Sequence, residues 1–548
     1  MKKKKMDTKN VILVTVIATV FLVAAVGSAS ALPDCPAPEN TKINVSCELN
    51  QSYNVQAGHG YIIDADDITI DGKGHTITGV GCSATAPPIV GVLNFNTTRK
   101  YGYNNVTIKN LEVENFCMGI RIGGKYNPTT KKCVINVVDN MIEHCTVHDN
   151  GNSSYVGDAS TGINFWPCVN YSTITKCDVY NTTGSAGTPP CESGGAGIRL
   201  KMACKHNDIT DNTLHNNRGP GILAKAKCQY DYVANNDMYQ NGEVSYTGPT
   251  GGIVLRCKNS NNWLIEENNI QDNYGPGIWI GGSWNVVKDN TVEGSKNRNA
   301  GDVSVGRGIS IERQPEAGKN NRLEDNKVCF NEGGDIFVLA SGYNNTGDEN
   351  CCDIAENYDD DGTTGCTYCC TKDLIITDIW LGRDWSCISR EDIELEQKEI
   401  EEFICEADVK NVEQEELIDY IKERDVDQEK MTKELAVEKC IRGRRVHYRI
   451  MNRGCQEWAG WSVSNLTVDG VSPWPPWLGW DLVRPLAPKT SREEWFWLYR
   501  LPGGQHNVKV CADFPNWISE CNETNNCLTK TLGGPTLVTP IPIPPRER

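Results

Sequence analysis

The sequence predicts an all-β protein in which a single-stranded parallel β-helix precedes a second domain of strands with a helical insertion. A pattern close to N-x2-I/L-x2-N-x-I/V-x2-N, a loop and then G-I-x-I/L recurs between residues 62 and 340, about every 25 to 35 residues, which is a solenoid period. Apolar residues alternate within each copy, as in short strands. Asn and Gly stand between the strands, where positive φ or side chain–backbone hydrogen bonds are needed.

Two copies show the repeat most clearly. Residues 105–122 read NVTIKNLEVENFCMGIRI, and residues 262–280 read NWLIEENNIQDNYGPGIWI. Strand, corner, strand, corner, strand and loop describe one coil, and we expect about ten coils. Asn residues at equivalent corners, such as Asn212 and Asn290, can stack coil on coil into a hydrogen-bonded ladder.

The N-terminal segment has the features of a secretory signal. Lys2 to Lys5 form a basic start, residues 11–26 an apolar core and Ala29-Ser30-Ala31 a cleavage site, which places a signal peptide at 1–31. The apolar run approaches the length of a membrane span, so an uncleaved anchor is the alternative. No second apolar run of that length follows, and we expect a secreted or cell-surface chain without a membrane span after cleavage.

Cysteine usage and charge agree with this location. All 25 Cys follow the signal, as expected in an oxidising compartment, and their odd number leaves at least one thiol free, intermolecular or modified. The net charge of −17 argues against nucleic acid as a partner. N-x-S/T motifs permit glycosylation, among them those at Asn44, Asn96, Asn105, Asn170 and Asn465.

The chain after the signal divides into four segments. Residues 32–340 are the β-helix with an N-terminal cap, for which we expect Cys35 and Cys47 to form a pin. Residues 341–372 are a Cys-rich cap or linker, because an uncovered coil would expose strand edges. Residues 373–533 form the second domain, with the helical insertion at 390–441, and residues 534–548 are a Pro-rich tail expected to be disordered.

The repeats, with DADDITIDGKGHTITG at 64–79, resemble the right-handed parallel β-helix proteins of the pectin-lyase-like superfamily. They are most similar to the NosD-like, carbohydrate-associated repeats of surface proteins, many of them archaeal. The resemblance implies a right-handed coil. It does not specify an activity, because the superfamily includes lyases, hydrolases, epimerases and non-enzymes.

The C-terminal part resembles CARDB, a cell-adhesion-related domain. The resemblance rests on residues 373–380, 446–470 and 501–526, the last ending in Glu520-Cys521-Asn522-Glu523-Thr524-Asn525-Asn526, which matches E-x-N-E-x-N-N. It implies an Ig-like β-sandwich that serves as an adhesion or spacer module. The helical insertion departs from the compact seven-strand pattern and puts an ordinary interface role for that face in doubt.

The outward positions of the G-I-x-L strands predict a ligand-binding strip. The x residue and the residue two further on point out of the coil, and stacking the coils aligns them. On an acidic chain, cations between two Trp suit an acidic glycan, with guanidinium forks on carboxylates and Trp faces on sugar rings. The alternative is a solvated face neutralised by nearby acids. The candidate residues are Arg199, Lys201, Lys225, Arg256, Trp166, Trp279 and Glu312.

Catalysis on this strip is the less favoured hypothesis. A hydrolase needs paired carboxylates, and a lyase needs acids for Ca²⁺ and a base. The strip offers bases but a single acid, Glu312, so the catalytic residues stay unknown. Gly58-His59-Gly60 is similar to a polygalacturonase motif, but it lies in the N-terminal cap, too early in the chain to face a groove.

Two further groups of residues are candidate sites. Zinc could use the spacing of the cysteines after residue 350, but a secreted chain favours disulfides for Cys351, Cys352, Cys366, Cys369 and Cys370. The oxygen-rich Asp359, Asp360 and Asp361 are a weak Ca²⁺ candidate, and no other cofactor is expected. The Pro-stiffened segment with Trp474, Trp477 and Trp480 is a candidate partner or sugar patch, with core packing as the alternative.

These features together predict a secreted or cell-surface protein that binds carbohydrate, with acidic polysaccharide favoured, or mediates adhesion, without catalysis. One alternative is a polysaccharide lyase or glycoside hydrolase acting on uronate-containing glycans. The other is a structural component of a cell envelope.

Overall fold

The computed structural model describes most of the chain between residues 32 and 533. The predicted signal peptide (1–31), residues 389–440 of the predicted helical insertion and the tail (534–548) lie outside the described residues. The described residues are 32–83, 88–96, 99–152, 160–185, 194–246, 248–255, 260–297, 306–312, 318–339, 344–360, 363–388, 441–455, 458–460, 462–473, 479–499, 504–514, 518 and 520–533.

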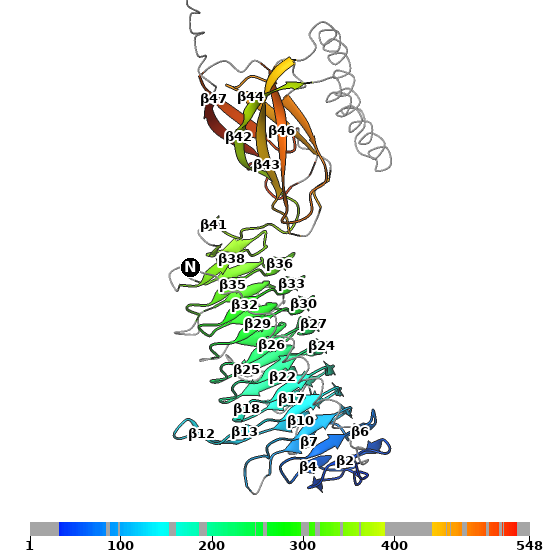
Figure 1. The fold of residues 1–548 in the computed structure, drawn as a ribbon. Helices are drawn as coiled ribbons and strands as arrows, with labels where there is room; N and C mark the ends of the chain where they lie inside the picture. Colours follow the sequence, from blue (N-terminus) through cyan, green and yellow to red (C-terminus); the bar gives the residue numbers. More distant parts are fainter. Residues whose placement is uncertain are drawn as a thin grey trace, which may run out of the picture.

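Residues 41–364 form a β-helix, a rod of stacked coils built from three long sheets (Figure 1). Each sheet is named after one of its strands. The β10 sheet contains, in spatial order, β1 (Thr41–Ile43), β4 (Tyr61–Ile63), β7 (Val90–Asn94), β10 (Met118–Ile122), β17 (Thr161–Phe165), β22 (Ala196–Lys201), β25 (Ile222–Lys225), β28 (Ile253–Leu255), β31 (Ile278–Ile280), β34 (Ile309–Ile311), β37 (Ile336–Val338) and β39 (Ala355–Glu356).

The second strand of each coil joins the β8 sheet. Its members are β2 (Cys47–Glu48), β5 (Thr69–Asp71), β8 (Thr107–Lys109), β14 (Met141–Glu143), β19 (Thr173–Thr175), β23 (Asp208–Thr210), β26 (Tyr232–Ala234), β29 (Leu264–Glu266), β32 (Val286–Lys288), β35 (Arg322–Glu324), β38 (Thr346–Asp348), β40 (Asp359–Asp360) and β41 (Thr363–Thr364). All its pairings are parallel except β40 with β41.

The third strand joins the β9 sheet. Its members are β3 (Tyr53–Asn54), β6 (Thr76–Thr78), β9 (Glu112–Glu114), β15 (Thr146–His148), β20 (Asp178–Tyr180), β24 (Thr213–His215), β27 (Asp237–Tyr239), β30 (Asn269–Gln271), β33 (Thr291–Glu293) and β36 (Lys327–Cys329). Three short pairs lie in the loops: β11 (Lys125–Asn127) with β12 (Lys132–Ile135), β13 (Val137–Val138) with β18 (Val169–Asn170), and β16 (Gly151–Asn152) with β21 (Thr183–Gly184).

Inward-facing aliphatic side chains form the core of the rod. One column of isoleucines follows the β10 sheet in strict register: Ile120, Ile163, Ile198, Ile222, Ile253, Ile278, Ile309 and Ile336. All of them are buried. Because the same side chain meets its own kind on the next coil, the parallel register buries a continuous apolar column.

The predicted asparagine ladder is present at the corner between the β8 and β9 sheets. In each step an Asn Nδ2 donates to the Oδ1 of the Asn on the next coil, over 2.9 to 3.0 Å. The backbone N–H groups of these residues donate to the same oxygens, so few corner donors stay unpaired. The ladder contains Asn212, Asn236, Asn268, Asn290, Asn326 and Asn350, and it ends on Asp360.

The residues that precede the ladder asparagines adopt the left-handed backbone conformation. Asp211 and Asp289, directly before the ladder residues Asn212 and Asn290, have φ of 56° and 55°. Short polar side chains tolerate this region because they hydrogen-bond locally. The segments Asp211-Asn212-Thr213 and Asp289-Asn290-Thr291 therefore form corners of the repeat.

The C-terminal domain is an antiparallel sandwich of seven strands. One sheet is β42 (Leu374–Ile388), β43 (Ile441–Asn452) and β46 (Ser491–Tyr499); the other is β45 (Trp480–Val483), β44 (Ser462–Val468), β47 (Gln505–Cys511) and β48 (Cys527–Gly533). Ile379, Tyr448, Leu466, Val508 and Val510 are buried between the sheets. Ile388 pairs with Ile441, so the segment between them leaves and re-enters at the end of one long hairpin.

The sandwich follows the last coils of the β-helix (Figure 1), and two disulfides join the two parts: Cys351–Cys455 and Cys369–Cys521. Backbone hydrogen bonds reinforce the junction, from Cys455 N to Cys369 O and from Cys521 N to Lys372 O. The two domains are therefore covalently linked outside the main chain. The described part of the chain contains no helix with the length and apolar character needed to cross a bilayer.

Candidate functional site

The strand registers of the β10 sheet align the outward positions as the sequence predicted. Arg121 lies opposite Asn164, Asn164 opposite Arg199, and Lys201 opposite Lys225. The same column continues through Leu223, Val254, Trp279, Ser310 and Phe337. The basic residues therefore occupy neighbouring coils, at the N-terminal half of the column.

Aromatic rings and cations alternate in a column that runs across neighbouring strands of the β10 sheet, near the C-terminal ends of those strands. The Arg121 guanidinium carbon lies 4.7 Å from the Phe95 ring centre and 4.5 Å from that of Trp166. Lys201 Nζ lies 5.3 Å from the Trp166 ring centre. Arg121 and Lys201 come from the coils before and after Trp166, so cations take both faces of its ring. We name Phe95, Arg121, Trp166 and Lys201 the cation–aromatic column.

This arrangement changes the role expected for Trp166. The sequence predicts that its faces stack on sugar rings, but Arg121 and Lys201 lie against those faces, and its Nε1–H points to Met202 Sδ at 3.3 Å. The ring can meet a ligand only at its edge. Trp166 thus fixes the cations in place, and the charges become the groups available for recognition.

The cations of this region are held in an environment that disfavours their charge. Burial, together with the charge of Arg199, lowers the pKa of Arg121 to about 10. Burial lowers the pKa of Arg199 to about 9, and burial with the nearby charge of Lys225 lowers the pKa of Lys201 to about 8. A negatively charged ligand would favour the protonated forms and offset these terms.

The middle of the predicted strip is covered. Arg199 is fully buried and its Nε donates to Asn164 Oδ1 over 3.3 Å; Lys225 is 2% exposed. The Tyr246 hydroxyl, whose charge acts on Arg199, donates to Gly194 O over 2.7 Å. Loops of the neighbouring coils therefore cover this part of the face. Arg199 and Lys225 are buried beside the cation–aromatic column and are not exposed on the surface.

The two C-terminal candidates have structural partners. Trp279 is 2% exposed and packs with Leu223 and Val254. Glu312 accepts hydrogen bonds from Ser310 Oγ at 3.0 Å and from Arg307 Nη1 at 3.2 Å. Arg256 lies outside the described residues. The accessible part of the predicted strip is therefore its N-terminal end, at the cation–aromatic column.

His59 lies closer to this end than its place in the sequence suggested. Burial and the charge of Arg121 lower its pKa, and its Nδ1 accepts the Val90 N–H over 3.0 Å. The N-terminal cap thus brings a neutral imidazole near Arg121. The first coils stack on β10 through β7, and the expectation that His59 lies too early in the chain to face a groove stays a prediction.

A second group of titratable residues lies on the β9 face. His148 Nδ1 is 2.7 Å from Asp149 Oδ2, and its Nε2 is 3.0 Å from Glu112 Oε1 and 3.7 Å from Glu114 Oε2. Burial opposes the charged imidazole, but the hydrogen bonds to Asp149 and Glu112 outweigh it and raise the pKa of His148. The three acids and the imidazolium form a compact ion cluster, which we name the His148 cluster.

The His148 cluster begins a stack of rings that sequence reasoning missed. His148, Tyr180, His215 and Tyr239 stack on successive coils, with ring centres 4.7 to 4.9 Å apart. Glu112 also lines a shallow hollow of about 530 Å³ with Lys73, His144 and Thr146. The signal was available, since TVH, DVY, TLH and DMY occupy the same place in successive repeats. The histidines appear scattered only until the repeats are aligned.

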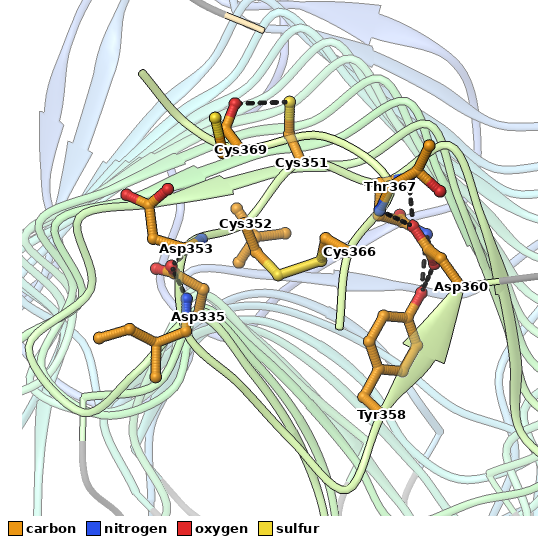
Figure 2. The surroundings of a disulfide bond; sticks show 12 residues. Asp335, Cys351, Cys352, Asp353, Tyr358, Asp360, Cys366, Thr367 and Cys369 are labelled. Atoms are coloured by element: carbon orange, nitrogen blue, oxygen red, sulfur yellow. Dashed lines mark hydrogen bonds between the residues drawn. A yellow bond between two sulfur atoms is a disulfide. The ribbon is translucent and has the colours of Figure 1, made fainter. Parts of the chain in front are cut away.

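Two buried aspartates at the C-terminal end of the rod, Asp335 and Asp360, accept hydrogen bonds from asparagine side chains (Figure 2). Asp360 is buried, and its carboxylate accepts hydrogen bonds from Asn350, Thr367 N and the Tyr358 hydroxyl. Asp335 accepts the Asn331 amide and the N–H groups of Asp353 and Ile354. Asp360 thus takes the place of Asn at the C-terminal end of the Asn350 ladder. Asp359 is exposed, Asp361 lies outside the described residues, and the calcium site at 359–361 stays a prediction.

The cysteines of the cap form disulfides, as the sequence favoured. Cys352 pairs with Cys366 (Figure 2), Cys370 with Cys329, and Cys351 and Cys369 with the sandwich. The predicted Cys35–Cys47 pin is present at the other end. Four described cysteines are free and buried: Cys145, Cys177, Cys204 and Cys228.

The predicted Trp patch is described only in part. Trp480 begins β45, and its ring meets Phe514 edge-on with centres 5.1 Å apart. Trp474 and Trp477 lie outside the described residues, so the patch stays a prediction. Among the N-x-S/T motifs, Asn170 and Asn465 are each 8% exposed, which disfavours glycosylation at those two positions.

Comparison with protein families agrees with both parts of the fold. Residues 101–246 and 161–352 match the family model described as right handed beta helix region, and residues 431–530 match CARDB. The chain is a right-handed β-helix followed by a CARDB domain. The CARDB match spans β43 to β48, and the described strand β42 completes the domain on its N-terminal side. No curated protein matches the sequence.

Several solved structures are similar in shape at low identity. The periplasmic alginate epimerase AlgG is 15% identical with a TM-score of 0.38, covering 58% of this chain and 74% of its own. The Dettilon tailspike protein gp208 is 12% identical with a TM-score of 0.33, covering 85% and 74%. The DFA-IIIase of Arthrobacter chlorophenolicus A6 in complex with GF2 is 13% identical with a TM-score of 0.33, covering 57% and 72%.

Proposed function

We propose that this β-helix binds acidic polysaccharide outside the cell, along the β10 face at the cation–aromatic column, and that the CARDB domain serves as an adhesion or spacer module. The observation that carries the proposal is the column itself. Arg121 and Lys201 lie two coils apart on either side of Trp166, and burial lowers the pKa of both.

The spacing of these cations suits a polymer rather than a small anion. Neighbouring coils are about 4.8 Å apart, so charges on successive coils form a row parallel to the rod axis. A uronate chain carries a carboxylate on successive sugars and can follow such a row. Arg121 offers a planar fork and Lys201 a point charge, and both side chains are partly buried.

Two other features support an extracellular location. The described residues contain eight disulfides, two of which fix the sandwich to the β-helix. The N-terminal segment has the pattern of a secretory signal. A rod with disulfide-fixed ends would hold a glycan face at a set distance from whatever the CARDB domain contacts.

The test is calorimetric titration of the mature chain with uronate hexasaccharides and with neutral hexasaccharides of equal length. We expect salt-sensitive binding of the uronates only, weakened at least about tenfold by Arg121→Ala and by Lys201→Ala. Lys288→Ala is the matched control, because Lys288 lies on the β8 face, 2.6 Å from Glu266. Equal uronate affinity in all three variants, or equal binding of neutral sugars, would overturn the proposal.

A polysaccharide lyase or glycoside hydrolase is the second candidate, and the His148 cluster beside the hollow is the observation that favours it. Glu312 is the one carboxylate among the described candidate residues on the β10 face, and Arg307 donates a hydrogen bond to it. Catalysis by paired acids is therefore better placed at Glu112 and Glu114. New unsaturated or reducing ends that disappear in Glu112→Gln would support it. An envelope component without a glycan ligand would show neither binding nor products.

A further inference from the structure

The loop that carries the E-x-N-E-x-N-N motif contains buried oxygen atoms without hydrogen-bond partners. Glu520 Oε2, Asn525 Oδ1 and Asn526 Oδ1 are all buried and unpartnered, and so is Asn526 Nδ2. Asn526 is only 4% exposed. Buried polar atoms are nearly always paired, so three such oxygens within seven residues indicate a missing partner.

The surrounding hydrogen bonds fix these oxygens in place. Glu520 Oε1 accepts the Leu374 N–H over 3.1 Å, which leaves Oε2 as the second carboxylate oxygen. The Asn525 amide donates to both oxygens of Asp373 over 3.1 Å, so its own Oδ1 points the other way. These hydrogen bonds therefore fix the orientation of the Glu520 carboxyl and the Asn525 amide.

Asn526 faces the interior of the sandwich, at the end where Asp513 lies. Its backbone oxygen accepts the N–H of Ala512 over 2.9 Å, directly before Asp513. Leu528, two residues later on the same side of β48, packs on the sandwich core. Asp513 is itself fully buried, with Oδ2 accepting the Ile518 N–H over 2.8 Å.

Negative charge accumulates at the same place. Burial, then the charges of Asp513, Asp373 and Glu523, raise the pKa of Glu520 to about 8. Burial also raises the pKa of Asp373, although the hydrogen bond from Asn525 and the charge of Arg453 oppose this. Arg453 is the cation that acts on this group, against four carboxylates. A cation among them would offset both the repulsion and the unpaired oxygens.

We propose that Glu520, Asn525 and Asn526, beside Asp513 and Asp373, form a calcium site at the junction of the sandwich and the β-helix. The donors are carboxylate and amide oxygens, which Ca²⁺ prefers. The sulfurs of Cys369 and Cys521 also lie close to Asp373, but they are joined in a disulfide and are not thiolate ligands. The site would connect the loop at 520–526 to the start of the sandwich, where Asp373 and Leu374 lie. The same loop is joined to the cap by the Cys369–Cys521 disulfide.

The experiment uses the mature chain after calcium removal with EGTA and dialysis. We expect calorimetric titration with CaCl₂ to show a site that Glu520→Gln weakens at least about tenfold. In EGTA, Glu520→Gln should melt at a higher temperature than the wild type, because it lacks a carboxyl group whose ionised form is disfavoured by burial and by the neighbouring carboxylates. With calcium the order should reverse. Asn526→Asp, which keeps an oxygen ligand, should bind calcium at least as tightly as the wild type.

Asp359→Asn is the control that separates this site from the acidic cap. It should leave the Glu520-dependent binding unchanged, since Asp359 is an exposed residue of β40. Loss of the calcium effect in Asp359→Asn but not in Glu520→Gln would place the ion in the cap and overturn the proposal. So would a wild type whose melting temperature is the same in EGTA and calcium, which would leave ordered water as the partner of these oxygens.

Discussion

The β10 and β9 faces of the rod share one backbone repeat but carry opposite chemistry. On the β10 face, Arg121, Arg199 and Lys201 are cations whose pKa values are lowered by burial. The charge of Arg199 also lowers the pKa of Arg121, and the charge of Lys225 also lowers that of Lys201. On the β9 face, acids surround His148, and its pKa is raised. One face disfavours its own charge and the other neutralises it.

The difference shows what each part of the repeat determines. Inward Ile and corner Asn columns are the same on every coil, and they fix the rod. Outward positions are free to vary, yet the parallel register places them in columns, so any chemical pattern in the repeat becomes a row on the surface. A row of cations whose charge is disfavoured by burial suits an anionic ligand, whereas a row of paired acids and imidazole stabilises the fold.

The largest expected effect comes from the shared scaffold beneath both faces. Asn268→Ala should lower the free energy of unfolding by about 3 kcal/mol, because it removes the acceptor of the buried Asn236 N–H and the hydrogen bonds that the Asn268 amide donates to Val233 O and Asn290 Oδ1. Asn269→Ala, the exposed neighbour, is the control and should change stability by less than about 0.5 kcal/mol. Chemical denaturation compares the two; similar losses would contradict the ladder's role.

The next effect separates the faces by pH. The pKa of Lys201 is about 8, so its positive charge is lost as pH rises through that value. Uronate binding to the wild type should therefore weaken several-fold between pH 7 and pH 9 beyond the change seen in Lys201→Arg. Calorimetry at the two values checks it. A wild type and Lys201→Arg with the same pH dependence would remove Lys201 from the site.

A smaller effect of opposite direction is expected on the β9 face. The pKa of His148 is raised, so its ion pairs stabilise the protein fully below the unfolded pKa, and this contribution is lost as pH rises through the folded value. His148→Gln should lower the melting temperature on the order of 1 to 2 °C at pH 5.5 and by less at pH 8.5. The more exposed His144→Gln serves as control, and an equal loss at both pH values would argue against the imidazolium.

The last effect concerns the ring stack. Tyr180 has a ring on each side, whereas Tyr239 ends the described stack and is exposed. We expect Tyr180→Ala to cost about 1 to 2 kcal/mol and Tyr239→Ala about half of that. Denaturant melts of the two variants give the ratio. Equal costs would mean that stacking contributes little beyond the burial of each ring.

The sequence predicted the fold well because period and alternation are local properties. Ile120 and Ile163 meet on neighbouring coils since both follow Gly in the same motif, and Asn212 and Asn290 are ladder residues for the same reason. The loops were less accessible to this reasoning. Disulfides such as Cys351–Cys455 join segments whose separation follows no repeat.

The candidate site was predicted in position but not in exposure. The alignment of Arg121, Arg199 and Lys201 follows from register, yet burial depends on loops of other coils, such as the one that brings Tyr246 close to Arg199. Phe95 was missed because it lies after its strand, outside the G-I-x-L motif. The His148 and Tyr180 stack was not predicted, because His and Tyr alternate at this position and the pattern is visible only when successive repeats are aligned.

The most direct test of the glycan-binding account is a crystal structure of the mature chain with a bound uronate hexasaccharide. The account predicts sugar density along the β10 face, with carboxylates against Arg121 and Lys201 and the Trp166 ring met at its edge. Density confined to the β9 face, in the hollow beside Glu112 and His144, would contradict it and favour the catalytic candidate.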